Sequence, residues 1–357
     1  MLAGVNLAFV FLVAGVWGLT AAVVLALMVW SPTTLSSQPR WRRLRGCAVA
    51  LTGAIVLVLF AVHKSVPLEA AQATMIRPLL RAVGFSYVAL RCVELLRAGA
   101  EGTASSVEWL DAVNYLFPFH MLAAGPIQSW SAFQDGHNDQ ERLSEQETWT
   151  AIERIVHGLF KKFVLARVLE ITFLTGFRAP MPYRVLEIQL YYVWVYLDFS
   201  AYSDIAVGAG RLLGIPTPEN FARPLAARNI MEFWSRWHMT LSSFIRRNIF
   251  IPMQLTLSRR VAPSTVPYVA ILSLFVAFIL CGMWHAVSLR FALWGAMHAL
   301  AIVAYSLYER ALRRRVRGGA RAAYLANRGV RIMATAVTFE FVAFSLAFVA
   351  YPATFLR

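Results

Sequence analysis

Charged residues are scarce in this sequence. Only 15% of its 357 residues are Asp, Glu, Lys or Arg, whereas 59% are hydrophobic. A soluble domain carries about 25% charged residues, so this composition argues against an ordinary cytosolic or secreted enzyme. Apolar runs of about 20 residues, the length that crosses a bilayer, recur along the whole chain. We therefore expect an all-α polytopic membrane protein in the cell (inner or plasma) membrane.

Cysteine is also scarce, and several catalytic signatures are missing. The three cysteines, Cys47, Cys92 and Cys281, are scattered without a CxxC pair, which indicates neither a zinc site nor a disulfide framework. No HExxH or similar close pairing places several metal ligands on one helix face, so we expect no metal site. No GxSxG string is present, which argues against a serine nucleophile on a strand-to-helix turn.

Acidic residues are outnumbered by basic ones, 19 against 34, for a net charge of +15. The basic residues form short runs between apolar segments, which is typical of the positive-inside arrangement rather than of nucleic-acid binding. We expect no nucleic-acid partner, and we place the clusters around residues 40–45, 246–260 and 310–321 in the cytoplasm. The candidate spans are 5–30, 46–62, 73–96, 107–125, 155–177, 186–214, 266–284, 291–308 and 331–351.

The charge pattern also predicts topology. The N-terminus lies outside, and 266–308 forms a helical hairpin whose tip points outward. Counting the earlier spans in strict alternation contradicts this, so we expect one middle segment to be re-entrant. No repeat or long linker divides the chain, which predicts a single domain over residues 1–357.

Charged residues interrupt several spans. Residues 73–96 include Arg77, Arg81, Arg91 and Glu94, and residues 155–177 include Lys161 and Lys162. Two interpretations remain open for the basic residues: they face a bundle interior, or they snorkel to the interface. Asp198 is too short to snorkel far. It lies with Asp204 in the polar island 196–204, which predicts a hydrated pocket.

Histidines are the residues best suited to chemistry near neutral pH. Residues 233–247 have the spacing of an amphipathic helix, with His238 on the apolar face beside Trp234. His238 is then either a core residue satisfied by one hydrogen bond or a catalytic group. His285 follows Trp284 at the hairpin tip, and His298 lies inside the next span. An imidazole at the tip suits a general base, a structural cap or a proton relay.

Four strings in register, with three more in support, resemble one family. They are YVWVYLDFSAYSDIAVGAGRLLGI (192–215), PENF (218–221), FWSRWHMTLSSFIRRNIFIP (233–252), MWHAVSLRFALWGAMHA (283–299) and, in support, AGPI (124–127) with GLFKKFVLA (158–166) and GFSYVALRCVELL (84–96). Together they are similar to the membrane-bound O-acyltransferase (MBOAT) superfamily over about residues 84–300. The likeness is greatest to its bacterial branch, which includes the alginate O-acetylation subunit and the D-alanyl transferase of teichoic acids.

The resemblance implies an all-helical funnel of about 9–11 transmembrane or re-entrant helices, open toward both sides of the membrane. It implies a thioester donor, acyl-CoA or an acyl-carrier protein, presented from the cytoplasm, with no bound cofactor. The acceptor is a hydroxyl, such as that of a cell-surface polysaccharide, and the acyl group is acetyl or D-alanyl. An extracytoplasmic partner protein is a further implication.

The family histidines correspond to His285 and His238, which we expect to be catalytic. His285 is expected to act as general base, and His238 to hold the donor or to relay the proton. Around them, the expected substrate-binding residues are Asp198, Ser200, Tyr202, Trp234, Trp284 and His298. Trp284, Tyr202, Ser200 and His238 are candidate oxyanion donors, and Asp198 is a candidate to orient an imidazole. The chain has Ala286 and Ala201 where the family strings carry glycine.

Two other functions fit the same residues. A proton-coupled transporter or flippase would use Asp198, Asp204 and the histidines as proton sites. Transporters of that kind commonly contain internal repeats, and this sequence shows none. A non-catalytic subunit of a polysaccharide export complex would keep the fold and leave the histidines without a chemical role.

Overall fold

The computed structural model describes residues 2–34, 42–65, 84–103, 107–138, 143–174, 180, 182–316 and 318–351. Throughout these ranges the chain is mainly helical, with no β-strand and one isolated bridge, between Phe221 and Trp237. The expected all-α class is therefore confirmed. The residues form two compact units: Met1–Ile155 with Ile205–Pro218 (unit 1), and Val156–Asp204 with Glu219–Arg357 (unit 2).

Five of the described helices are long and apolar enough to cross a bilayer. They are α1 (Leu2–Thr34), α2 (Arg42–Ser65), α13 (Val266–His285), α14 (Leu289–Arg315) and α16 (Arg328–Ala350). They cover the spans expected at 5–30, 46–62, 266–284, 291–308 and 331–351. The protein is a multi-pass membrane protein in contact with the lipid bilayer.

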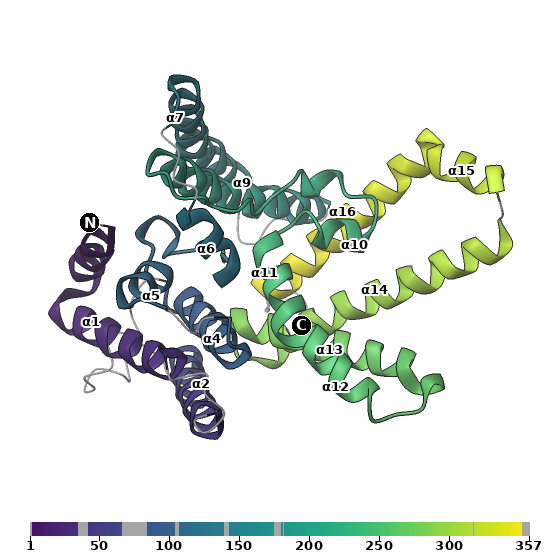
Figure 1. Cartoon of the computed structure of the whole chain (residues 1–357). Helices are drawn as coiled ribbons and strands as arrows, with labels where there is room; N and C mark the ends of the chain where they lie inside the picture. Colours follow the sequence, from purple (N-terminus) through teal and green to yellow (C-terminus); the bar gives the residue numbers. More distant parts are fainter. Residues whose placement is uncertain are drawn as a thin grey trace. The chain divides into compact units, whose positions relative to one another are not determined.

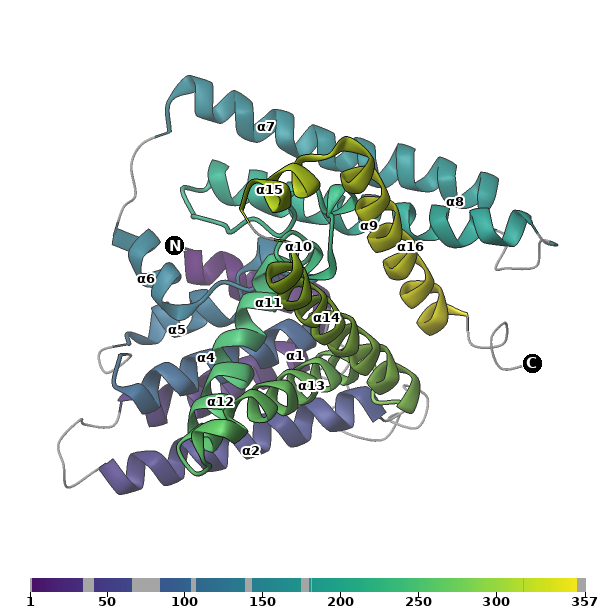
Figure 2. The same cartoon turned by 90° about the vertical axis from the view of Figure 1, so that its right-hand side faces the viewer.

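Unit 1 is built on α1, α2 and α4 (Phe85–Glu101), which lie side by side in Figures 1 and 2. The short helices α5 (Trp109–Leu116) and α6 (Trp130–Asn138) complete it, together with the first part of α7 (Glu145–Phe160). Arg91 of α4 is fully buried and donates to the carbonyls of Met121 and Pro126. It therefore faces the interior and does not snorkel, whereas Arg77 and Arg81 lie outside the described residues.

The single span expected at 107–125 is wrong. Helix α5 ends at Leu116, and Pro118 precedes a single 3-10 turn at Phe119–Met121. Proline disfavours a helical conformation in the residue before it, so a helix cannot run straight through this point. The carbonyls to which Arg91 donates, those of Met121 and Pro126, lie in the segment that follows this break. A buried cation paired with backbone carbonyls is a known way to place charge at membrane depth.

Unit 2 contains the remaining helices. In chain order they are the π-helix η4 (Lys161–Ala166), α8 (Arg167–Phe173), α9 (Tyr183–Leu212), α10 (Ile230–Trp234), α11 (Met239–Ile245), the π-helix η6 (Arg246–Phe250), α12 (Ile251–Ser258), α13, α14, α15 (Gly318–Ala326) and α16. The boundaries between the units fall inside α7 and α9. The span expected at 186–214 corresponds to α9, and the span expected at 155–177 to the end of α7 with η4 and α8.

The hairpin expected at 266–308 is confirmed. Helices α13 and α14 pack along one another, and residues 286–288 form the turn between them. Ser288 caps α14 by accepting from the backbone N–H of Phe291. Gly282 and Gly295 allow the close approach, because a Cβ at either position would lie within 2.1 Å of a backbone carbonyl oxygen on the other helix.

Candidate active site

His285 is the last residue of α13 and is exposed at the hairpin turn. Its ring contacts three aromatic rings: Trp284 at 4.8 Å, Trp294 at 5.7 Å and Phe291 at 6.0 Å between centroids. Ala286, which follows it, has an extended backbone (φ −156°) that any residue adopts. An alanine therefore fits the backbone at this position without strain, although the family strings carry glycine there. The aromatic walls fix the imidazole while leaving it accessible.

His238 is buried, with 2% of its surface exposed. The amphipathic helix expected over 233–247 is wrong at this residue: α10 ends at Trp234, α11 starts at Met239, and His238 between them has a left-handed conformation (φ 42°, ψ 50°). Left-handed backbone costs about 1–2 kcal/mol in a residue with a side chain. Such strain persists only where surrounding contacts impose it, and it clusters at functional sites.

Those contacts come from the PENF segment. The backbone of residues 220–222 pairs with residues 236–239, through Met239 N to Asn220 O (3.0 Å) and Ala222 N to Arg236 O (2.9 Å). This pairing brings the fully buried Asn220 against His238. In the sequence, PENF contributed only to the family resemblance, and Asn220 was not among the predicted site residues. The available signal was a polar side chain within a string that carries the resemblance.

The amide oxygen of Asn220 determines the protonation of His238. The backbone N–H of Thr240 donates to Oδ1 at 3.3 Å, and the Thr240 hydroxyl lies 2.8 Å from it. Because a backbone N–H can only donate, this end of the amide is the oxygen. The Nδ1 of His238, 3.1 Å from the same oxygen, must then carry the proton, which leaves the lone pair on Nε2.

The electrostatic environment keeps His238 neutral. His238 lies outside the five long apolar helices, and its burial, with charge on His285 as the smaller cause, lowers its pKa to about 3. The indole of Trp284 contacts both histidine rings, at 6.3 Å for His238 and 4.8 Å for His285. One aromatic residue thus connects the two histidines that the sequence singles out.

The aromatic rings around His285 and His238 continue into a second group, which contains His298 and Trp234, and we call the two groups together the aromatic cluster. His298 is fully buried on α14, accepts from the indole N–H of Trp234 at 3.2 Å, and lies 3.0 Å from the Ser345 hydroxyl. The first bond leaves Nδ1 unprotonated, so Nε2 carries the hydrogen and donates to Ser345. Ser345 in turn donates to the carbonyl of Val342. Both ring nitrogens are engaged within the protein, which suits a supporting role better than substrate binding.

Trp294 joins these two groups and was also missed from the sequence. Its ring lies 5.7 Å from His285, 4.6 Å from His298 and 6.1 Å from Trp234. The string MWHAVSLRFALWGAMHA contains it, four residues from His298 and nine from His285. A tryptophan within an apolar helix carries no local signal that separates packing from function.

The predicted residues of α9 are arranged differently. Asp198 forms an ion pair with Lys162, and Asp204 forms one with Lys161 at 2.6 Å. Asp198 lines a cavity of about 440 Å³ with Lys162, Arg167 and Glu170 among its other residues, at the position where the polar island predicts a hydrated pocket. The π-helix η4 supplies both lysines, so charges in this region pair with one another.

Helix α9 contacts the histidines through a residue that was not singled out. Phe199 lies 4.8 Å from the ring of His238, edge to face. Ser200 is buried and bonds to the Leu197 carbonyl of its own helix, and Tyr202 is partly buried. The side chain that orients His238 is the amide of Asn220 and not the carboxylate of Asp198.

A cavity of about 250 Å³ lies beside the cluster in unit 2. Its lining is mostly apolar and includes Trp234, Ser242, Arg246 and Cys281. Cys281 precedes His285 by four residues on α13, and residues four apart lie on the same helix face, so the cavity is about one helical turn from His285. Ser242 lies in α11, where its backbone N–H donates to the carbonyl of His238 at 3.1 Å. Throughout the described ranges, no three His, Cys, Asp or Glu side chains are grouped to hold a metal ion.

Comparison with known proteins decides the family. The model of the MBOAT, membrane-bound O-acyltransferase, family matches residues 10–347. The chain belongs to the membrane-bound O-acyltransferase family. The resemblance expected from the sequence strings is confirmed, and with it the class of acyltransferase at the level of the family. The matched range includes both histidines, Asn220 and the hairpin.

Curated relatives give the branch. A teichoic acid D-alanyltransferase of Bacillus subtilis (strain 168) is 27% identical over 282 residues, which cover 74% of this chain and 68% of the relative. A peptidoglycan O-acetyltransferase of Helicobacter pylori is 30% identical over 220 residues, 58% of this chain and 39% of the relative. A probable alginate O-acetylase of Pseudomonas syringae pv. tomato is 28% identical over 226 residues, which cover 61% of this chain and 41% of the relative. The chain spans about two thirds of the first relative's length and less than half of the other two.

Proposed function

We propose that this protein transfers an acyl group, acetyl or D-alanyl, from a cytoplasmic thioester to a hydroxyl of a cell-surface polysaccharide. The observation that carries the proposal is the pair of histidines on one tryptophan. His285 is exposed within aromatic walls, and His238 is buried as a neutral imidazole. Family membership and relatives named for D-alanyl or O-acetyl transfer support the same reaction.

His285 acts as the general base. Its imidazole takes the proton of the acceptor hydroxyl while that oxygen attacks the thioester carbonyl. The tetrahedral intermediate then expels the thiolate, which receives the proton from the imidazolium, so that protons and electrons balance. General-base assistance of this kind contributes roughly 10²–10⁴-fold to the rate.

His238 supplies a hydrogen-bond acceptor beside this base. Its Nδ1–H is committed to Asn220, and Nε2 holds a lone pair, so a neutral His238 cannot donate to a developing oxyanion. We therefore assign His238 to orienting the hydroxyl or relaying its proton. The indole N–H of Trp284, which is a donor only, is the group we assign to the oxyanion. Asn220 is a positioning residue that acts through His238.

The donor occupies the cavity lined by Ser242 and Cys281. An acylated thiol arm is long, flexible and largely apolar, which fits a mostly apolar cavity about one turn from His285. Arg246 in the lining would pair with a phosphate of the arm. Acyl-CoA and an acyl-carrier protein both carry such an arm, and the positively charged loops suit either donor.

The experiment follows a labelled acyl group in membranes containing the full chain. Acetyl-CoA and a D-alanyl-carrier thioester are supplied with peptidoglycan, lipoteichoic acid or alginate as acceptor. We expect His285→Ala to lower transfer by at least 10²-fold, with expression and thermal stability retained. His157→Ala, a change in a histidine of α7 outside the aromatic cluster, should transfer at the wild-type rate.

Transfer that continues at the wild-type rate in the His285→Ala protein would refute the assignment of His285 as the general base. Transfer no greater than in membranes that lack the chain would refute the enzyme proposal and would instead favour a transporter or a non-catalytic subunit. The donor that labels the acceptor identifies the acyl group and decides between coenzyme A and a carrier protein.

A further inference from the structure

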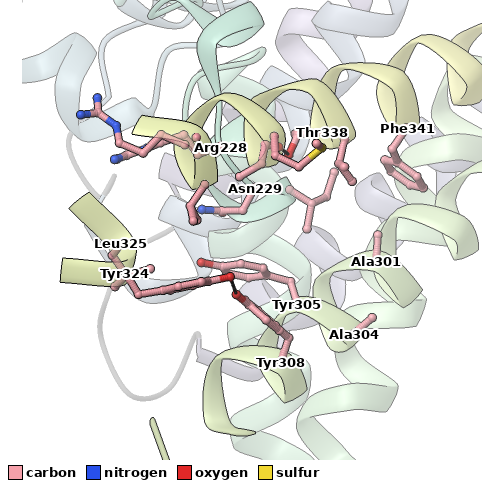
Figure 3. Close-up of a pocket in the computed structure, with 17 residues that line it drawn as sticks. Arg228, Asn229, Ala301, Ala304, Tyr305, Tyr308, Tyr324, Leu325, Thr338 and Phe341 are labelled. Carbon is pink, nitrogen blue, oxygen red and sulfur yellow. Dashed lines mark hydrogen bonds between the residues drawn. The ribbon is translucent and has the colours of Figure 1, made fainter. Parts of the chain in front are cut away.

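Helices α14, α15 and α16 enclose a cavity of about 840 Å³ that the acyl-transfer site does not use. Figure 1 shows α15 joining the far ends of α14 and α16, and Figure 3 shows the cavity lining.

The cavity follows one stripe of α16. Val330, Ala334, Val337 and Phe341 recur every three to four residues, which places them along one helix face. At 1.5 Å per residue the stripe is about 16 Å long. The hydrocarbon core of a bilayer is about 30 Å thick, so the groove is as deep as a single leaflet. On α14, the small side chains of Ala301 and Ala304 leave the space that makes it a groove.

The tyrosine and arginine residues of the lining gather at one end. Tyr305 and Tyr308, in the second half of α14, lie with Tyr324 near the end of α15, and the hydroxyls of Tyr308 and Tyr324 are 3.1 Å apart (Figure 3). Thr338, which lines the cavity nearer Phe341, donates its hydroxyl to the carbonyl of Ala334 in its own helix. Arg331 lines the same end at the start of α16 and is exposed. The other end is closed by Ala301 and Phe341. This gradient matches an amphiphile with its head at the tyrosines and its tail toward Phe341.

The charge at the polar end is positive. No carboxylate belongs to the lining, and the nearby Glu309 is held by Arg313 and Arg321. Arg228 is bidentate on Glu232, a carboxylate that Arg236 also contacts. Among the described residues, Arg331 is the lining arginine that forms no ion pair, so it offers positive charge to a ligand. The last turns of α14 add Arg310, Arg314 and Arg315 to the same end.

The basic end places the groove in the cytoplasmic leaflet by the positive-inside rule. That leaflet contains the anionic lipids, which basic residues near its surface attract. We propose that this groove binds an anionic glycerophospholipid. One acyl chain lies along α16 from Val330 to Phe341, and the phosphate binds Arg331 and the tyrosine hydroxyls.

The tail end of the groove reaches the layer that supports the acyl-transfer site. Phe341 lines the groove and also contacts the ring of His298 at 5.2 Å. A bound chain would therefore stabilise the packing behind Trp234 and His298 without touching His285. The inference is independent of the proposed reaction, because it concerns lipid retention by the folded protein.

The test is native mass spectrometry of the full chain released from nanodiscs of equal phosphatidylglycerol and phosphatidylcholine. We expect one retained lipid, with phosphatidylglycerol in clear excess. Arg331→Gln should lower that preference about fivefold, the ratio for one basic residue at an anionic surface. Arg314→Gln, which removes one charge from the same basic cluster outside the lining, is the matched control and should lower the preference less than Arg331→Gln does. Equal retention of both lipids, or an unchanged preference in Arg331→Gln, overturns the proposal.

A second variant tests the position of the tail. Ala304→Trp fills the groove and should abolish retention, whereas Ala311→Trp, exposed on α14 outside the lining, should not. The wild-type protein provides a measurement that does not depend on folding of a variant. Phosphatidylglycerol with a diazirine on its acyl chain should label peptides of α14 that include Ala301 or Ala304 and peptides of α16 that include Val337 or Phe341. Labelling confined to other helices overturns the proposal.

Discussion

The amide oxygen of Asn220 lies 3.1 Å from Nδ1 of His238 and accepts the backbone N–H of Thr240 as well. A residue eighteen positions away thus sets which nitrogen of His238 carries the proton. Burial lowers the pKa of His238 to about 3, so this imidazole stays neutral across the physiological range. If activity falls on acidification while the pH is still above about 4, the group that becomes protonated must be another one.

Replacing this amide by a carboxylate changes that balance. In Asn220→Asp, the carboxylate still accepts from Nδ1 but favours the imidazolium, which raises the pKa of His238 by about 1–3 units. Because His238 must be neutral to accept a proton, we expect its protonation to add a loss of activity between about pH 4 and 6, so that the acid limb of the rate profile becomes steeper there. The profile of transfer rate against pH measures this change.

Two variants control for structural damage. Thr240→Val removes a hydroxyl donor to the same oxygen but keeps the backbone N–H, and it should keep the wild-type acid limb. Asn220→Ala removes the acceptor and should lower the rate at every pH. An acid limb unchanged in Asn220→Asp would show that Asn220 does not act through His238.

His238 combines a chemical role with a strained backbone, and the two are separable. Asn tolerates the left-handed region better than other residues with side chains, so His238→Asn should fold as stably as the wild type while lacking the imidazole. We expect its turnover to fall by at least 10²-fold with the melting temperature within a few degrees. Transfer at the wild-type rate in this variant would make His238 a core residue.

The ion pair of Lys162 with Asp198 predicts a different response. Removing one partner leaves a charge without its counterion near membrane depth, whereas removing both leaves none. Asp198→Asn should therefore lower both the melting temperature and the yield of active protein, and Lys162→Gln in the same chain should restore much of both. Both groups are a third or more exposed, which limits the effect to about 1 kcal/mol.

A catalytic role for Asp198 would give the opposite result. If Asp198 oriented an imidazole or bound substrate, the double variant would regain stability without regaining turnover. Measuring melting and transfer on the same four proteins completes the double-mutant cycle.

The parts of the fold that sequence predicts well are those governed by composition. The hairpin of α13 and α14 follows from two apolar runs between basic clusters, and His285 falls at its tip because the first run ends there. The five long apolar helices have the same origin. Hydrophobic length is a local property, so no knowledge of the neighbouring chain is required.

The break at His238 has a non-local cause. The helical spacing of apolar residues continues through 233–247, and no Gly or Pro marks an interruption. The helix is interrupted because residues 220–222 pair with 236–239, and tertiary contacts of this kind override local propensity. The break at Pro118, in contrast, has a local signal, which is the proline itself. The expected span at 107–125 rested on the length of the apolar run and did not take that proline into account.

The charges within the spans show the same limit. The sequence left two interpretations open for the lysines, that they face a bundle interior or that they snorkel to the interface. The structure pairs Lys161 with Asp204 and Lys162 with Asp198. These partners are 36 to 43 positions apart, so no spacing rule connects them. The orientation of His238 by Asn220, rather than by Asp198, required the same kind of long-range information.

Gly295 offers a direct test of the hairpin that carries His285. A Cβ at this position would lie 2.1 Å from the carbonyl oxygen of Phe278, a backbone atom that cannot move aside without displacing α13. Gly295→Ala should therefore destabilise the hairpin by about 3 kcal/mol, because overpacking at a rigid contact typically costs 1–3 kcal/mol or somewhat more. The melting temperature in detergent should fall by several degrees.

Gly319 provides the matched control for this change. It lies in α15, where a Cβ meets no atom within 4 Å, so Gly319→Ala gains helix propensity without a clash. We expect the same substitution to raise or preserve the melting temperature there. Since α13 and α14 position His285 against Trp284 and Trp294, transfer in Gly295→Ala should fall along with stability. A Gly295→Ala protein that melts with the wild type would show that the two helices do not pack as closely as these contacts require.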